Sequence, residues 1–257
     1  MHAFLLVGCG AVGLAIGSFL NVVIHRVPKG ESIVRPRSRC PSCGTEITPR
    51  DNVPVLSWLA LRGKCRHCGE PISPRYPLVE FLTAALFVLT AARFGIRPEL
   101  PAYLVFVAAD VALAAIDLDT FTLPRKIVWP LFGTSVVLLA IAAVVDGDVD
   151  HARDAAVGSA IAFGVLFLVH VISPRGMGFG DVRLAAVLGL FLGWLELGAV
   201  AVGLFLSFLL ASVVGVALIV AGRRGRKDRI PFGPFLLAGT YVAFFVAKPL
   251  LDGYLGR

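Results

Sequence analysis

The chain has 257 residues, of which 57% are hydrophobic and 16% are charged, and its mean hydropathy is +0.84. Soluble domains usually carry about 25% charged residues, so this composition excludes an ordinary soluble protein and indicates a membrane protein. The formal net charge of +7 does not require nucleic acid as a partner, because membrane proteins concentrate Lys and Arg in their cytoplasmic segments.

Eight apolar segments approach or exceed the roughly 20 residues that cross a bilayer in a helix, which satisfies its own backbone hydrogen bonds. The sequence therefore predicts an all-α polytopic membrane protein with about eight transmembrane helices. Only Gly193, Trp194, Glu196 and Gly198 separate the sixth segment from the seventh, and a single long helix there would invert the topology downstream. The expected spans are 3–24, 77–93, 100–117, 127–145, 155–172, 184–198, 199–221 and 232–251.

The first span is expected to be retained, with its N-terminus outside. It has no basic region before its apolar core and no small-residue cleavage site, so it does not look like a signal peptide. With this orientation the cytoplasmic segments hold 19 of the 24 Lys and Arg residues, in agreement with the positive-inside rule. We expect the basic run GRRGRKDR at 222–229 to anchor the chain at the lipid surface. The cytoplasmic segments are 25–76, 118–126, 173–183 and 222–231.

Two Cys-x2-Cys pairs stand in the long polar segment between the first two spans. They occur in RCPSCG at 39–44 and KCRHCG at 64–69, and each has Gly after its second Cys. Four such thiolates suit a tetrahedral Zn²⁺ site. Two disulfides are the alternative, but thiols stay reduced in the cytoplasm, where this segment is expected. We predict a cytoplasmic zinc domain over 25–76 with a structural metal, because four cysteines leave no coordination position open; the ligands are Cys40, Cys43, Cys65 and Cys68.

Acidic side chains inside or beside apolar segments are candidates for function, because charge is costly there. Asp110 lies within the third span, Asp117 and Asp119 lie at its cytoplasmic end, and Asp181 opens the sixth span after glycines. The expected topology puts Asp117 and Asp181 at the same depth on the same side. Neighbouring carboxylates can divide acid and base roles, as in aspartic proteolysis. The residues alone also allow Asp181 to cap its helix, or the acids to form a proton or ion pathway.

A resemblance to the type IV prepilin leader peptidase family covers nearly the whole chain. The sequence is similar to that family across 30–80, which includes the paired cysteines, and at three shorter stretches. These stretches are GSFLNVVIHRVP at 17–28, GMGFGDVRL at 176–184 and IPFGPFLLAG at 230–239. The stretch GMGFGDVRL carries the GxGD motif of the family.

The resemblance implies that Asp117 and Asp181 are the two catalytic aspartates. Asp181 ends the GxGD motif, and Asp117 is separated from Pro124 by the six residues LDTFTL, as in the first motif of the family. Asp119 would stand too close to this proline and is expected to be a helix-end residue. Relatives usually have Asp where this chain has Arg125, which is expected to change the charge of the loop and its contacts with substrate.

The resemblance also implies the function of a prepilin peptidase of the bacterial inner membrane, an aspartic protease. It would cleave type IV prepilins or type II secretion pseudopilins after a Gly, and S-adenosylmethionine would serve to methylate the new N-terminus. The domains would be the first helix at 1–24, the zinc domain at 25–76 as the methyltransferase part, and the peptidase domain at 77–257. Two alternatives stay open: a peptidase without methyltransferase activity, and a non-catalytic assembly factor or proton-coupled transporter.

No site for S-adenosylmethionine can be located from residue spacing, because no glycine-rich nucleotide loop follows a strand. Asn21, Arg75 and Glu80, near the boundary of the zinc domain, are candidates. Anchoring of the domain interface or helix capping explains each of them as well. Trp58 is expected to be a packing or interfacial residue.

Overall fold

The structure is a computed structural model, and it describes residues 2–174, 176–223, 225, 228 and 230–255. The regular structure of these residues is helical, and their strand-like pairing is limited to two isolated bridges. This confirms the expected all-α fold. The basic residues Arg224, Arg226, Lys227 and Arg229 of the expected lipid anchor lie outside the described residues.

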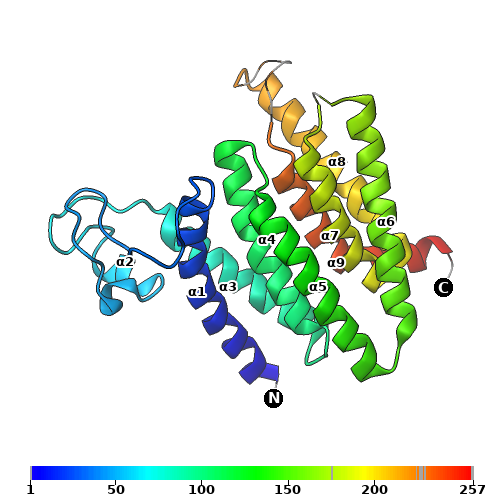
Figure 1. The fold of residues 1–257 in the computed structure, drawn as a ribbon, viewed down its shortest axis with the longest axis horizontal. Helices are drawn as coiled ribbons and strands as arrows, with labels where there is room; N and C mark the ends of the chain where they lie inside the picture. The colour runs from blue at the N-terminus through cyan, green and yellow to red at the C-terminus, as the bar shows by residue number, and fades with distance from the viewer. Residues whose placement is uncertain (1, 175, 224, 226–227, 229, 256–257) are drawn as a thin grey trace. The chain divides into compact units, whose positions relative to one another are not determined.

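Eight long helices follow one another along the described part of the chain (Figure 1). Seven of them are long and apolar enough to cross a membrane, so the chain is a multi-pass membrane protein. A 3₁₀ turn, η1 (Pro49–Asn52), and a short helix, α2 (Leu56–Ala60), lie between the first two long helices. The long helices are α1 (His2–Arg26), α3 (Arg75–Phe94), α4 (Leu100–Thr120), α5 (Arg125–Asp146), α6 (Val149–Ile172), α7 (Phe179–Leu195), α8 (Leu197–Val220) and α9 (Gly233–Leu255).

The expected break between the sixth and seventh spans is present at Glu196. The backbone of this residue is extended, with φ −175° and ψ 141°, and α8 begins at the next residue. The alternative of one long helix is therefore wrong. α7 also starts at Phe179, ahead of the expected start at 184, because the glycine-rich motif itself forms the first helical turn.

α7 is the short central helix of the second half of the chain. It has 17 residues, which corresponds to about 26 Å at 1.5 Å per residue, against roughly 30 Å for the hydrocarbon core of a bilayer. Twelve of its residues are buried, among α5, α6, α8 and α9. A Cβ added at Gly189 or Gly193 would collide with the α6 backbone, so small residues let these two helices touch. Because protein surrounds α7, it does not need the length of a lipid-facing span.

The chain divides into two compact units, Met1–Ala112 and Leu113–Arg257, and the division falls within α4. In the first unit, α1 and α3 lie side by side (Figure 1). A Cβ at Gly13 would stand 2.7 Å from Cα of Ala84, and one at Gly17 would stand 2.6 Å from Cα of Glu80. Glycine at these two positions therefore lets the backbones of α1 and α3 pack closely against each other.

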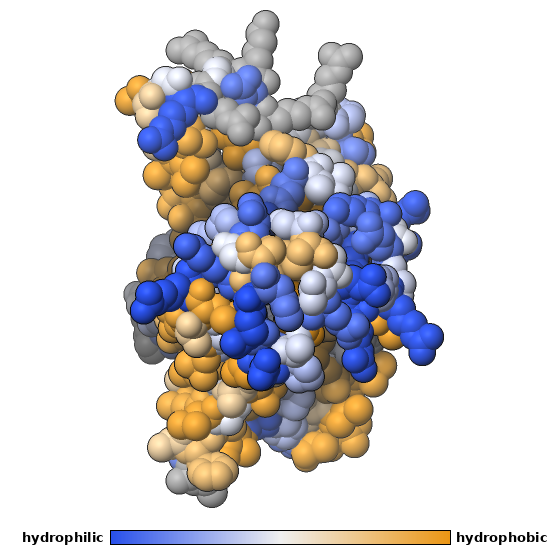
Figure 2. All heavy atoms as spheres, turned by 90° about the vertical axis from the view of Figure 1, so that its left-hand side faces the viewer, coloured by the Kyte–Doolittle hydropathy of each residue, from blue (hydrophilic) through white to orange (hydrophobic). Residues whose placement is uncertain are grey.

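The polar segment at 27–74 belongs to the first unit and contains η1 and α2. Figure 2 shows a hydrophilic face over this segment, in contrast to the hydrophobic surface of the helices. Its two isolated bridges join Arg39 to Glu46 and Lys64 to Pro71. Because it has so little regular structure, its fold must depend on the short turns around the cysteines.

Candidate active site and metal centre

Asp117 is held at the place where α4 ends and α9 begins. Its side chain is buried, and its Oδ2 accepts a hydrogen bond from the backbone N–H of Gly233 at 3.0 Å. Gly233 is the first residue of α9, where backbone N–H groups have no partner within the helix and favour a carboxylate. A Cβ at position 233 would stand 2.7 Å from Oδ2 of Asp117. Only glycine leaves room for the carboxylate at this distance.

Asp181 lies in the first turn of α7, and its side chain turns back toward the loop before the helix. Its Oδ2 accepts the backbone N–H of Gly178 at 3.1 Å, so the capping role that the sequence allowed is present. The loop is itself held from α6, because Nδ1 of His170 is 2.8 Å from the carbonyl oxygen of Met177. The His170 ring also packs against Phe179 with centroids 5.6 Å apart. Asp181 is buried as well.

The structure brings Asp117 and Asp181 together in the second unit, close enough to interact electrostatically. Leu123 contacts the neighbours of both residues. A Cβ added at Gly180 would lie 3.2 Å from Cβ of Leu123, and a Cβ added at Gly233 would lie 3.3 Å from Cδ2 of Leu123. The end of α4 and the starts of α7 and α9 therefore converge on one buried, glycine-lined site with two carboxylates.

The other acidic candidates occupy different environments. Asp119 is exposed at the last turn of α4, whereas Asp117 is 4% exposed. Asp110 is buried farther back in α4, and its Oδ1 has no hydrogen-bond partner among the described residues. The burial and the contact with α9 thus favour Asp117 over Asp119 as the partner of Asp181.

Two arginines flank the aspartates in sequence and interact with each other electrostatically. Arg125 is the first residue of α5. Arg183 lies in α7, where its guanidinium carbon Cζ lies over the Phe179 ring, 5.6 Å from the ring centroid. These two side chains put positive charge at the starts of α5 and α7.

The four predicted cysteine ligands come together in the first unit. Their sulfur atoms all lie within 4.8 Å of one another, and Sγ of Cys40 is 3.8 Å from Sγ of Cys68. A Zn–S bond of about 2.3 Å in a tetrahedral site gives an S···S separation of roughly 3.8 Å. All four cysteines are free thiols, so the disulfide alternative is not realised. The geometry fits a tetrahedral metal ion.

Each cysteine pair is built by the same local turn. Cys40 N–H donates to the carbonyl of Thr45 and Gly44 N–H donates to that of Cys40, and the second pair repeats this with Cys65, Glu70 and Gly69. Gly44 and Gly69 have φ of +71° and +75°, a left-handed conformation that glycine adopts without a Cβ clash. This explains why Gly follows the second Cys in both motifs.

Two residues at the aspartate site were not assigned from the sequence. Gly233 was noted only as part of the family-like stretch IPFGPFLLAG, although Gly followed by Pro after a loop is a signal for a helix start. His170 had no assignment, and its sole signal is a polar residue near the end of an apolar helix just before the glycine-rich motif. Gly233 acts through a contact with a residue 116 positions away, which spacing along the chain does not reveal. His170 acts on the loop that follows its own helix, but a single polar residue does not indicate which atom it contacts.

Comparison with known proteins assigns the family. Residues 104–220 match the type IV leader peptidase family, and residues 11–94 match the bacterial peptidase A24 N-terminal domain. The chain belongs to the type IV leader peptidase family.

Curated relatives carry the name prepilin leader peptidase/N-methyltransferase. A relative from Myxococcus xanthus is 46% identical over 84% of this chain and 64% of its own length. One from Aeromonas hydrophila is 36% identical over 94% of this chain and 91% of its own length, and one from Bacillus subtilis is 34% identical over 95% of each. No solved structure matches the chain.

Proposed function

We propose that Asp117 and Asp181 are the catalytic pair of a bifunctional prepilin peptidase. The observation that carries this proposal is the convergence of the two buried carboxylates at the starts of α7 and α9. Each offers one oxygen to a backbone N–H, from Gly178 to Asp181 and from Gly233 to Asp117. The bonded oxygens fix the orientation of the carboxylates and leave the other two oxygens for water and substrate.

The two aspartates would divide the work of peptide hydrolysis. Neighbouring carboxylates do not both ionise readily, so one holds a proton while the other is charged. The charged one draws a proton from a water molecule as the water attacks the Gly carbonyl, and the protonated one donates to the carbonyl oxygen. Gly178 and Gly233 let the backbone come close to the carboxylates of Asp181 and Asp117, which fixes the position of both groups.

The substrate is the leader region of a type IV prepilin or a type II secretion pseudopilin. Its apolar helix lies in the bilayer, so the cleavage site after Gly is presented at the membrane interface. We place the aspartates and the cysteine domain on the cytoplasmic side of the inner membrane, with the N-terminus outside, because this orientation puts 19 of the 24 Lys and Arg residues in the cytoplasm. Lipids and the substrate are then the main partners of the chain.

The second activity is N-methylation of the new N-terminus, for which S-adenosylmethionine would supply the methyl group. Cys40, Cys43, Cys65 and Cys68 would hold a structural Zn²⁺ that stabilises the segment at 27–74. The relatives that match the chain over most of its length are named for both activities.

The test is co-expression of the chain with a reporter prepilin in membranes, with leader removal followed by mass. Asp117→Asn and Asp181→Asn should each abolish cleavage, whereas Asp119→Asn, the matched control, should cleave like the wild type. If Asp117→Asn still cleaves and Asp119→Asn does not, Asp119 would replace Asp117 as the partner of Asp181. Equal cleavage in all variants would favour a non-catalytic assembly factor or a transporter.

The same experiment separates the two activities. A mature product heavier by one methyl group supports the bifunctional enzyme. A processed product without that gain, in wild type and with the donor supplied, would support a peptidase that lacks methyltransferase activity.

A further inference from the structure

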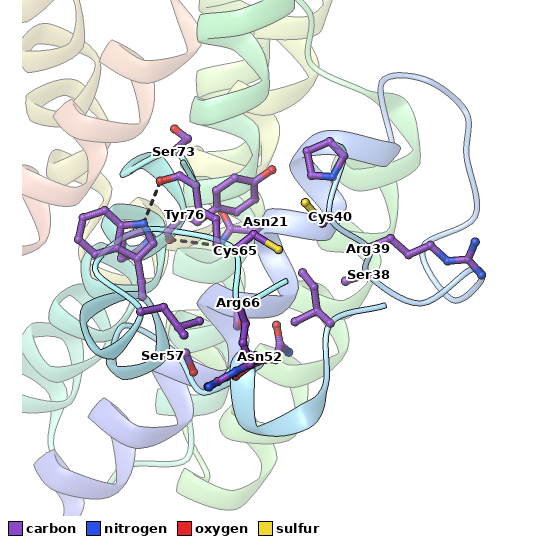
Figure 3. A pocket seen from close by; sticks show the side chains of 18 of the residues that line it. Asn21, Ser38, Arg39, Cys40, Asn52, Ser57, Cys65, Arg66, Ser73 and Tyr76 are labelled. Atoms are coloured by element: carbon purple, nitrogen blue, oxygen red, sulfur yellow. Dashed lines mark hydrogen bonds and ion pairs between the residues drawn. The ribbon is translucent and has the colours of Figure 1, made fainter. Parts of the chain in front are cut away.

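A cavity of about 700 Å³ opens in the first unit, between the cysteine segment and the ends of α1 and α3 (Figure 3). Its size falls in the range of roughly 300–1,000 Å³ that small-molecule sites have. The aspartate pair takes no part in this cavity, whose lining comes entirely from residues 15–80. Cys40 and Cys65 belong to its wall, so the metal centre supports one side of it.

Glu80 is the buried carboxylate among the charged side chains that line the cavity. It lies in the first turns of α3 and is 8% exposed, and it lines the cavity. Its Oε2 accepts the backbone N–H of Val55 at 2.7 Å, and Ser18 of α1 also hydrogen-bonds to the carboxylate. A carboxylate offers about four acceptor positions, so acceptor capacity remains after these two bonds.

Val55 shows that the wall of the cavity is held in an unfavourable conformation. It has φ of +59°, which is rare for a β-branched residue and is typical of positions that the surroundings force, often at functional sites. The bond to Glu80 stabilises it. Val55 precedes α2, which carries Trp58, so Glu80 fixes α2 against α3.

Aromatic and amide side chains complete the cavity. Tyr76 is 44% exposed and its ring stands among the lining residues in Figure 3. Trp58 is held by a hydrogen bond from its Nε1 to the carbonyl of Ile72 at 3.0 Å, and Nδ2 of Asn21 donates to the carbonyl of Tyr76 at 3.2 Å. The face of an aromatic ring can stack on a purine base. Side-chain amides can form hydrogen bonds with hydroxyl groups and with the amino and carboxylate groups of an amino acid.

A pair of opposite charges borders the cavity on the side of η1. Arg66 donates bidentate hydrogen bonds to Asp51, with Nη2 2.7 Å from Oδ1, and this contact lowers the pKa of Asp51. The pair closes the wall between the second cysteine turn and η1. The cavity thus combines one buried carboxylate, two aromatic rings and several polar groups on a scaffold held by local contacts.

We propose that this cavity is the methyl-donor site, in which Glu80 faces the positive sulfonium of S-adenosylmethionine and Tyr76 stacks on the adenine. The proposal rests on the methyltransferase half of the proposed function and names the site for it. In the transfer, the lone pair of the unprotonated N-terminal amine bonds to the methyl carbon as the carbon–sulfur bond breaks. The bonding electrons return to sulfur, and the methylated ammonium releases one proton to water. The donor therefore loses its positive charge, and S-adenosylhomocysteine leaves as a neutral thioether.

This change of charge gives a test that a purely structural role of Glu80 would not pass. Glu80→Gln keeps an acceptor for Val55 N–H and removes only the negative charge. We expect it to weaken binding of S-adenosylmethionine by at least about tenfold, as for loss of a charged interaction, and to weaken S-adenosylhomocysteine much less. Equal effects on the two ligands would overturn the role of Glu80, because a distorted wall would weaken both.

The binding measurements use the full chain, purified in detergent, with titration calorimetry and zinc content determined on each sample. Glu31→Gln removes an exposed carboxylate of the same segment that does not line the cavity, and it should bind both ligands like the wild type. Tyr76→Phe should also bind both, whereas Tyr76→Ala should bind both about tenfold or more weakly, because it removes the ring on which the base stacks. Unchanged binding in Tyr76→Ala would refute the stacking.

Photo-crosslinking with methyl-labelled S-adenosylmethionine then tests the place of the site directly. Label on a peptide from 15–80 supports the cavity, and label confined to 113–257 overturns it. Leader cleavage by the same wild-type sample reports on the peptidase separately. A sample that cleaves but binds neither ligand would refute the methyltransferase half of the proposed function, whereas binding without any effect of the lining variants would refute only this site.

Discussion

The cysteine cluster and the aspartate pair are built in opposite ways. The cluster consists of two copies of one local turn, in which each hydrogen bond joins residues a few positions apart. The aspartate pair depends on three helix ends, and the bond that holds Asp117 spans 116 residues of sequence. The cysteine cluster therefore needs only its own segment to be intact, whereas the aspartate pair needs the packing of the whole second unit.

Removal of one metal ligand should have the largest effect, and it should be confined to the first unit. Cys40→Ser should lose the bound zinc, whose binding is worth about 10–16 kcal/mol in small zinc domains. The segment at 27–74 should then exchange its amide hydrogens rapidly, and methyl transfer should fall below detection. Hydrogen exchange by mass spectrometry and metal analysis measure this change.

Cys9→Ser is the matched control, since Cys9 lies in α1 outside the cluster. It should keep its zinc and its slow exchange. If Cys40→Ser retained a protected segment at 27–74 without metal, the structural role of zinc would be refuted.

A single methyl group at position 233 should break the aspartate pair. The Cβ of Gly233→Ala would meet Oδ2 of Asp117 at 2.7 Å and displace it. A shift of about 1 Å in a catalytic group can cost roughly 100-fold in rate, so leader cleavage should fall by about this factor. The rate of prepilin processing in membranes measures it.

Gly253→Ala adds the same methyl group at the other end of α9, where no atom lies within 4 Å of the new Cβ. It should cleave at the wild-type rate. Equal rates in the two variants would mean that the contact between α9 and Asp117 is not needed for catalysis.

Loss of the His170 contact should have a smaller effect on the same site. His170→Ala removes the bond to Met177 and loosens the loop before Asp181, so kcat should fall about tenfold, as expected for about 1.4 kcal/mol. KM should change little, because His170 positions Asp181 and is not expected to contact the substrate. His151→Ala, in the same helix but at its exposed start, should leave both constants unchanged, and a change confined to KM in His170→Ala would contradict the positioning role.

The smallest effect is expected from the charge at Arg125. Arg125→Asp removes one of the two neighbouring positive charges at the starts of α5 and α7, so a basic leader should bind more tightly, with KM lowered about two- to threefold at low salt. High salt should reduce the difference, because it screens exposed charges. Lys248→Asp, near the far end of α9, is the control of equal charge change, and an identical KM shift there would point to a general charge effect.

Sequence and structure agree where a feature is local. The cysteine turns, the glycine after each pair and most helix positions follow from spacing and apolar length, and the break at Glu196 was a weak but correct signal. The pairing of Asp117 with Asp181 was different, because their residues alone allowed capping and ion conduction as well. The roles of Gly233 and of the bond from Val55 to Glu80 depend on which helices meet, and helices that are apolar all round carry little information about their neighbours. The contacts of His170 are local, but a single His near the end of an apolar helix does not indicate its partner.

The shortness of α7 has a consequence for how the protein is made. A helix of 17 residues that carries an aspartate in its first turn is a poor substrate for insertion into lipid by itself. The contacts that Gly189 and Gly193 of α7 make with α6, and the contacts of α7 with α8, form only when those helices are present. We therefore expect α7 and α8 to enter the membrane together as a helical hairpin, and a nascent chain halted before α8 to leave the aspartate of α7 accessible to water-soluble reagents.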